Sequence, residues 1–113
     1  MPDEVPTLQD CRRELDAIDV ALVQVLARRS RVILEVIRYK RANSMPVVDR
    51  DREDRMLDGI EGVASAEGLD PRIARQVLGS VIDAFTLLEV EELGPDPVRS
   101  RDTDRGPGAE REG

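Results

Sequence analysis

Charged residues that could bind an anionic ligand recur along this 113-residue sequence, close to apolar positions. Arg29 and Lys40 are eleven residues apart, so on a helix they return to within about 20° of each other. Ile33 and Val36 lie between them on the same side. Two cations on one face suit a ligand with carboxylates, which an Arg guanidinium binds through two parallel bonds. The alternative is that each cation is a solvated side chain whose stem lies along apolar surface.

Arg12 differs from these two cations in its angular position on the same predicted helix. It lies 17 residues before Arg29, which places it about 100° away around the helix axis. Arg12 therefore cannot comfortably serve the same site from the same chain. In a dimer of long helices it could instead reach the site of the partner chain.

A second group of charged residues, Asp49, Arg52 and Glu53, falls on one face of a predicted helix that Met56 and Ile60 continue. Taken alone, this group is also typical of an acidic helix start that complements the helix dipole, with Arg52 paired to a neighbouring carboxylate. Its residues could otherwise contact hydroxyl and carboxylate groups of a ligand.

Glu89 continues an apolar stripe that contains Ile82 and Phe85. A carboxylate on such a stripe lies either at a fraying helix end or beside a polar site. Several cations together with a few carboxylates would suit a small dianion that carries hydroxyl groups.

Three helices are expected to position these residues. The first covers residues 8–42, because this stretch has no Gly or Pro, its apolar residues repeat every three or four positions, and Thr7 can cap it. The second begins at residues 49–51 and loses definition around residues 65–68. The third starts at Asp70-Pro71, a cap followed by proline, and ends at Gly94-Pro95. The sequence predicts an all-α fold, with a flexible N-terminal arm over residues 1–7, a helical domain over 8–93 and a disordered tail over 94–113.

The length of the first helix predicts a partner. About 35 residues make a rod of roughly 50 Å, whereas a compact chain of this size has a radius of gyration of about 13 Å. One small chain cannot cover both ends of such a rod. The simplest partner is a second copy of the chain.

Composition excludes several other kinds of protein. The net charge of −7 and the presence of only one Tyr, one Phe and no Trp argue against a nucleic-acid partner. One Cys and no His make an intrachain disulfide or a multi-cysteine metal site impossible and remove the commonest metal ligand. Neither a signal peptide nor a membrane-spanning apolar run is visible. We therefore expect a cytoplasmic protein without a membrane or nucleic-acid partner.

Between Leu8 and Glu92 the sequence resembles the all-α chorismate mutases of the shikimate pathway. The resemblance rests on Arg12 in CRRELDAID, Arg29 in LARRS, Lys40 in IRYKR and the stretch PVVDRDRE, residues 46–53, whose spacing fits without gaps. It implies an intertwined homodimer of three-helix chains that converts chorismate to prephenate by a Claisen rearrangement. It also implies that no cofactor, metal or covalent intermediate is needed.

The resemblance implies a role for each of these residues. Arg29 and the Arg12 that the partner chain contributes would hold the substrate carboxylates, with Arg52 completing that end. Lys40 would donate to the ether oxygen as the C–O bond breaks. Asp49 and Glu53 would contact the ring hydroxyl.

The third helix departs from the family pattern at two positions. The family often has a Ser or Thr and, one turn later, a Gln that donates to the ether oxygen, whereas this register has Phe85 and Glu89, with Thr86 adjacent. Phe85 cannot supply a hydroxyl. Glu89 can replace the Gln only when it is protonated, since an ionised carboxylate cannot donate. We therefore predict mutase activity that rises toward acidic pH.

Other functions remain open on the same scaffold. The chain could be an isochorismate pyruvate-lyase or a 4-amino-4-deoxychorismate mutase. The set Asp49, Arg52 and Glu53 favours a mutase over the lyase but does not separate a hydroxyl from an amino substituent. A third possibility is a non-catalytic helical dimer that regulates another shikimate-pathway enzyme, and an active mutase could also form a complex with such an enzyme.

Overall fold

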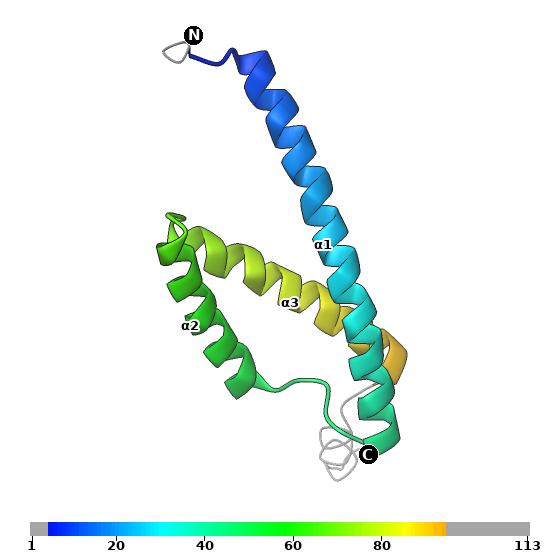
Figure 1. Cartoon of the computed structure of the whole chain (residues 1–113). Coiled ribbons are helices and arrows are strands. Elements are labelled where there is room, and N and C mark those ends of the chain that lie inside the picture. The colour runs from blue at the N-terminus through cyan, green and yellow to red at the C-terminus, as the bar shows by residue number, and fades with distance from the viewer. Residues whose placement is uncertain (1–4, 95–113) are drawn as a thin grey trace, which may run out of the picture. The chain divides into compact units, whose positions relative to one another are not determined.

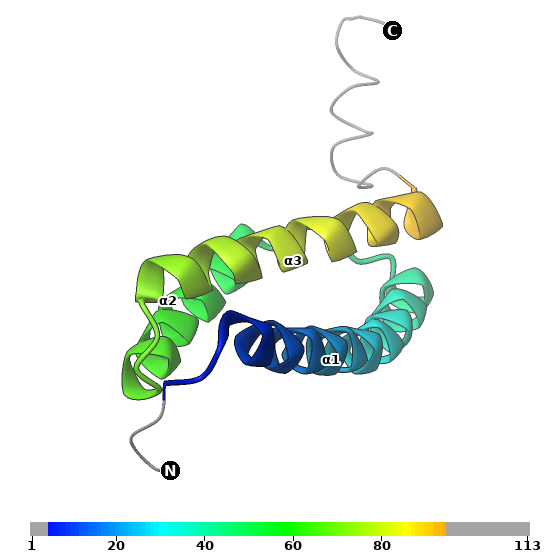
Figure 2. The ribbon, with the colours of Figure 1, turned by 90° about the horizontal axis from the view of Figure 1, so that it is seen from above.

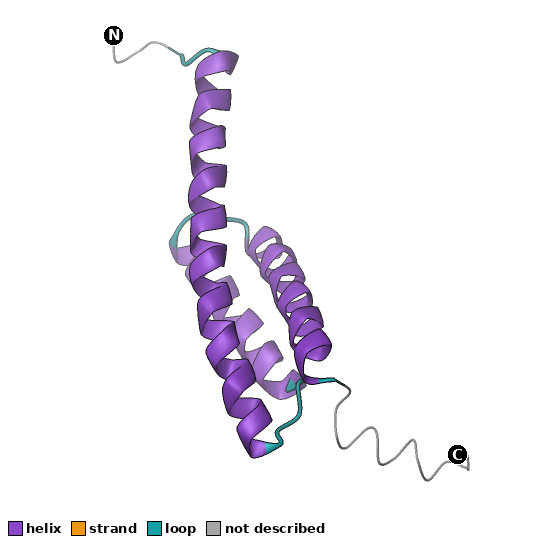
Figure 3. Ribbon diagram, turned by 90° about the vertical axis from the view of Figure 1, so that its right-hand side faces the viewer, coloured by secondary structure: helices purple, strands orange, loops and turns teal. Residues whose placement is uncertain are grey.

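The computed structural model describes residues 5–94, and all regular structure in this part of the chain is helical (Figure 3). The helices are α1 (Leu8–Asn43), α2 (Arg50–Ala66) and α3 (Pro71–Leu93) (Figure 1). The predicted all-α fold and its order of helices are therefore confirmed. The predicted disordered tail, apart from Gly94, lies outside the described residues, as do residues 1–4 of the predicted arm.

The chain divides into two compact units, residues 1–34 and residues 35–113, and the boundary falls inside α1. The described part of the first, N-terminal unit consists of residues 5–7 and the helix that follows them. This helix exposes about half of several large apolar side chains, including Leu15 at 56%, Ile18 at 54% and Leu22 at 55%. Its apolar stripe therefore remains accessible in the single chain.

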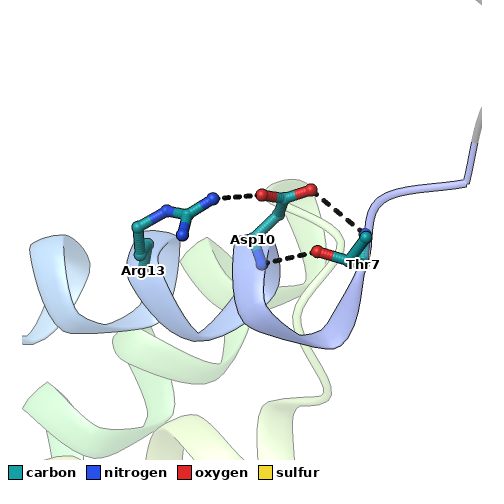
Figure 4. A network of polar contacts seen from close by, with 3 residues as sticks. All are labelled: Thr7, Asp10 and Arg13. Carbon is teal, nitrogen blue, oxygen red and sulfur yellow. Dashed lines mark hydrogen bonds and ion pairs between the residues drawn. The ribbon is translucent and has the colours of Figure 1, made fainter.

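The start of α1 is closed by reciprocal hydrogen bonds between Thr7 and Asp10 (Figure 4). The Asp10 backbone N–H donates to the Thr7 hydroxyl over 3.0 Å, and the Thr7 N–H donates to the Asp10 carboxylate over 3.2 Å. Arg13 pairs with the same carboxylate. This arrangement satisfies backbone donors that a helix start leaves without partners, and it fixes the first residue of α1.

The chain leaves α1 at Ser44, four residues after Lys40. The Met45 N–H donates to the Lys40 carbonyl over 3.0 Å, a bond that spans five residues and is typical of a Schellman closure. Such a closure needs a residue in the left-handed region, and Ser44 occupies it with a φ of 52°. A residue with a Cβ is strained there, since the left-handed conformation costs about 1 kcal/mol.

The second, C-terminal unit is built on the pairing of α2 with α3, which converge at the turn between them (Figures 1 and 2). Each of these helices buries a small residue, Ala64 in α2 and Ala74 in α3. Gly68 ends α2 with a φ of 77° and closes it by bonds from its own N–H to Ser65 and from the Leu69 N–H to Ala64. These are the two bonds of a Schellman motif, which favours glycine at this position.

The start of α3 follows the predicted signal, with Asp70 as cap and Pro71 as first residue. The Asp70 carboxylate accepts bonds from both the backbone and the guanidinium of Arg72. The Arg72 side chain, and then its backbone N–H, lower the pKa of Asp70 below its ordinary value. Asp70 therefore stays ionised as the cap that positions the first turn of α3.

Within residues 5–94, no helix is both long enough and apolar enough to cross a bilayer.

Candidate active site

Lys40 lies in the last turn of α1 and joins two other segments of the C-terminal unit. Its Nζ donates to the Val47 carbonyl over 2.7 Å and to Oε1 of Glu89 over 2.9 Å. Val47 belongs to the connector between α1 and α2, residues 44–49, and Glu89 belongs to α3. An ammonium group carries three protons. The two acceptors therefore leave Lys40 able to make one more hydrogen bond while its position is fixed.

Glu89 is a buried carboxylate, 7% exposed as a residue, in a unit whose core also includes Ile37, Val47 and Ile82. The helix continues past it to Leu93, so Glu89 does not lie at a fraying helix end. A buried charge requires a partner, and Lys40 supplies one. The structure thus brings together two of the residues that the sequence analysis selected, although 49 positions separate them.

Asp49 is the N-cap of α2, and its side chain accepts a hydrogen bond from the Arg52 backbone N–H over 3.1 Å. The Glu53 N–H donates to the Asp49 carbonyl. Arg52 is exposed and Glu53 is half-buried. The cap therefore orients one oxygen of Asp49 toward the helix, whereas the Glu53 side chain is one turn further along α2.

The remaining predicted site residues lie on α1 and α3. Arg12 is exposed and Arg29 is half-buried, and both belong to the N-terminal unit. Phe85 is half-buried on α3, one turn before Glu89, and its neighbour Thr86 is half-buried as well. The roles predicted for these side chains stay predictions.

Two contacts at this end of the C-terminal unit were not predicted from the sequence. One is the Val47 carbonyl, a backbone group that no side-chain pattern could indicate. The other joins Arg41 to α3, where Nη2 of Arg41 donates to the Glu92 carbonyl over 2.9 Å. The available signal for this contact was the position of Arg41, a second cation that directly follows the candidate catalytic lysine.

This geometry defines a class of protein, an all-α domain in which a half-buried lysine pairs with a buried carboxylate. The sequence pattern of the family "chorismate mutase type II" matches residues 11–90 of this chain, which includes all of α2 and most of α1 and α3. The chain belongs to the type II chorismate mutase family. The resemblance found in the sequence is thereby confirmed.

Individual relatives carry three different names. The chain is 28% identical over 105 residues to the 4-amino-4-deoxychorismate mutase of Streptomyces pristinaespiralis, covering 88% of this chain and 81% of that protein. It is 32% identical over 78 residues to the T-protein of Enterobacter agglomerans, covering 69% of this chain and 21% of that protein. It is 26% identical over 82 residues to the bifunctional chorismate mutase/prephenate dehydratase of Buchnera aphidicola, with coverage of 73% and 21%. The chain thus spans most of the first relative and about a fifth of the other two.

Proposed function

We propose that this chain is an isomerase that rearranges chorismate to prephenate. Membership of the type II chorismate mutase family supports this proposal. The observation that carries it is the ion pair of half-buried Lys40 with buried Glu89, in which Lys40 is also held by the Val47 carbonyl. A fixed ammonium group with one remaining proton can bind an oxygen on which negative charge develops.

In the proposed reaction, the ether C–O bond of chorismate breaks as a new C–C bond forms within the same molecule. Negative charge develops on the ether oxygen, and Lys40 donates a hydrogen bond to it. Glu89 donates a second bond when it is protonated, because protonation of Oε2 leaves Oε1 as the acceptor for Lys40. No proton has to leave the substrate, so the absence of His from the sequence is no obstacle. Catalysis then rests on holding the reactive conformer and stabilising charge.

The other charged residues would bind the substrate. Arg29 and the Arg12 of a second chain would hold the two carboxylates, with Arg52 completing that end. Asp49 and Glu53 would contact the ring hydroxyl, and Phe85 would line the site beside Glu89. Because the Asp49 side chain accepts from the Arg52 N–H, its orientation is set before a substrate arrives.

We further propose that the protein is an intertwined homodimer. The exposed apolar side chains along the N-terminal part of α1 support this proposal, since Leu15, Ile18, Leu22 and Val25 are each more than half exposed in the single chain. Two such helices could cover each other's apolar stripes. Arg12 of each chain would then complete the site of its partner.

Mixing two inactive variants tests this division of residues. Chains with Arg12→Ala and chains with Lys40→Ala each lack one component of every site in their own homodimers. A heterodimer contains one site with both residues, so refolding an equal mixture should restore about a quarter of the wild-type sites. Turnover measured after co-refolding checks this. No gain over the separate variants, in a mixture shown by mass to contain heterodimers, would contradict the shared site.

A second candidate substrate is 4-amino-4-deoxychorismate. The relative from Streptomyces pristinaespiralis, which matches 88% of this chain, carries that activity in its name. Carboxylates such as Asp49 and Glu53 suit an ammonium group as well as a hydroxyl. Incubating the purified protein separately with chorismate, isochorismate and aminodeoxychorismate, with products identified by mass, decides between the substrates and tests the lyase alternative. Turnover of none of them would contradict every enzymatic proposal.

The non-catalytic alternative has a test of its own. If the chain acts only by binding a shikimate-pathway enzyme, Arg29→Ala should leave that binding intact. If it is a mutase, the same variant should lose nearly all turnover while keeping its helical circular dichroism. The Buchnera relative, whose name joins chorismate mutase and prephenate dehydratase, makes a prephenate-consuming enzyme the first partner to examine in a pull-down.

A further inference from the structure

We propose that Arg41 is a positioning residue for Glu89, and that it acts by holding the last turn of α3. This inference rests on the proposed mutase function, because it concerns the same site. Its basis is the hydrogen bond from Nη2 of Arg41 to the Glu92 carbonyl over 2.9 Å. Arg41 takes no part in the chemistry derived above.

The last turns of α3 have the wrong charge for a helix C-terminus. The negative end of a helix dipole favours cations, yet Glu89, Glu91 and Glu92 are all acidic. Within the described helix α3, the last turn contains no basic residue. The end of α1 supplies the missing positive charge, since Lys40 and Arg41 are consecutive and both donate to α3. The two helix ends are therefore complementary in charge.

The Arg41 bond reaches a carbonyl that the helix itself leaves without a partner. The last four carbonyls of a helix have no intrahelical donor, and the closing Gly94 N–H donates to Val90. Arg41 satisfies the Glu92 carbonyl instead, and a donor with a full charge makes a stronger bond than a neutral one. Loss of this bond would allow the last turn of α3 to fray.

Fraying at Glu92 would be transmitted to Glu89. The two residues are three positions apart and lie on neighbouring parts of one helix face. The Glu89 carboxylate must be held at the distance that Lys40 and the substrate require, and small displacements of a catalytic group cost much of the rate. Arg41 thus fixes the backbone to which Glu89 is attached, while Lys40 fixes its side chain.

The test compares the Arg41→Ala variant with Arg41→Lys and with a matched control. We expect Arg41→Ala to lower kcat about tenfold and to change KM by less than about twofold, because Glu89 acts mainly in the transition state. Arg41→Lys should recover most of the loss, since an ammonium group can donate to a single carbonyl. Arg38→Ala is the control, because Arg38 is exposed on the same helix and pairs with Glu35 of that helix. It should match wild type.

A double variant separates positioning from a general loss of stability. In a Glu89→Ala background, Arg41→Ala should cause no further fall in residual kcat, since there is no carboxylate left to position. Hydrogen exchange of the last α3 amides should be faster in Arg41→Ala and unchanged in Arg38→Ala.

Three results would overturn the inference while leaving the proposed function intact: wild-type turnover by Arg41→Ala, an equal loss in Arg38→Ala, or additive losses in the double variant. Absence of turnover by the wild-type protein with chorismate and with its amino analogue would instead overturn the proposed function, and this inference with it.

Discussion

Ion pairs connect α3 to other helices at two places in the described part of the chain, and the two places differ in their access to water. Near the start of α3, Arg75 pairs with Asp58 over 3.0 Å and with Glu61 over 3.2 Å, and its side chain is 39% exposed. Near the end of α3, Glu89 pairs with Lys40 over 2.9 Å, with side chains only 9% and 17% exposed. The two Arg75 pairs form a surface link between α2 and α3, whereas the Lys40–Glu89 pair is largely shielded from water.

The difference in burial implies a difference in purpose. Exposed ion pairs contribute little to stability because water and salt screen them. A buried pair loses hydration on both sides, and apolar residues of similar volume often stabilise a fold as well or better. The Lys40–Glu89 pair is therefore a poor choice for stability alone, which supports a catalytic reason for its presence. The Arg75 pairs need no such reason.

The largest expected effect concerns the Lys40–Glu89 pair. Two variants separate its contribution to the free energy of unfolding from its contribution to turnover. Lys40→Met should lower the free energy of unfolding by about 3 kcal/mol, because it leaves Glu89 buried without its partner. The double variant Lys40→Met/Glu89→Leu should return to within about 1 kcal/mol of wild type. Both should lose at least about a thousandfold in kcat/KM.

Urea denaturation at fixed protein concentration and steady-state turnover measure these two quantities. Recovery of activity together with stability in the double variant would contradict a catalytic role for the pair.

A second, smaller effect concerns the protonation of Glu89. If its carboxyl group must donate a hydrogen bond in the transition state, turnover should fall as the pH rises. Glu89→Gln donates at every pH, so its pH–rate curve should be flat and should exceed that of wild type on the alkaline side. Rates from about pH 5 to pH 8 test this. A flat wild-type curve over this range would show that Glu89 does not act as a donor.

The exposed ion pairs of Arg75 should affect stability slightly and should not affect turnover. Asp58 first, and then Glu61, raise the pKa of Arg75, so it stays charged at every accessible pH. Arg75→Gln should lower the melting temperature by only about 1–3 °C and leave kcat unchanged. Thermal unfolding at low and at high salt measures the effect, which should shrink as salt screens the pair. A large loss of turnover would show that the surface link also supports the site.

The smallest expected effect is at the exposed pair of Asp70 with Arg72. The pKa of Asp70 is lowered from 3.8 in the folded chain, mainly by the side-chain bond from Arg72. Its contribution to stability is therefore present above the unfolded value and is lost as the pH falls through the folded value. Asp70→Asn keeps a good cap but removes this dependence. Unfolding midpoints of both proteins, measured from about pH 6 down to pH 3, should converge at the acidic end. A constant difference across this range would contradict this assignment.

Local signals explain why the helices could be predicted from the sequence. Thr7 and Asp70-Pro71 act through bonds within a few residues, and the structure confirms both of them. The pairing of Lys40 with Glu89 links residues 49 positions apart. Both residues were predicted to belong to one site, but their direct contact could not be predicted from the sequence. Long-range contacts depend on packing, and packing leaves only a weak trace in a single sequence.

Two further features of the site are even harder to predict from the sequence. Val47 contributes its backbone carbonyl, so the type of its side chain does not indicate this role. Arg41 looks like an ordinary solvated cation, because its acceptor is also a backbone carbonyl. The contribution of Arg12 to the partner chain's site stays a prediction that the complementation experiment tests.

The strained turn at Ser44 limits how this protein can change over evolution. Between the end of α1 and the start of α2, the connector must reverse direction, turn the Val47 carbonyl toward Lys40 and deliver Asp49 as the cap. The connector has six residues, so inserting or deleting one would change the position of the Asp49 cap relative to Lys40. Changes in loop length should therefore accumulate at the exposed turn between α2 and α3, where no candidate site residue lies. The connector serves as a spacer whose length sets the distance between the cap of α2 and the lysine of α1.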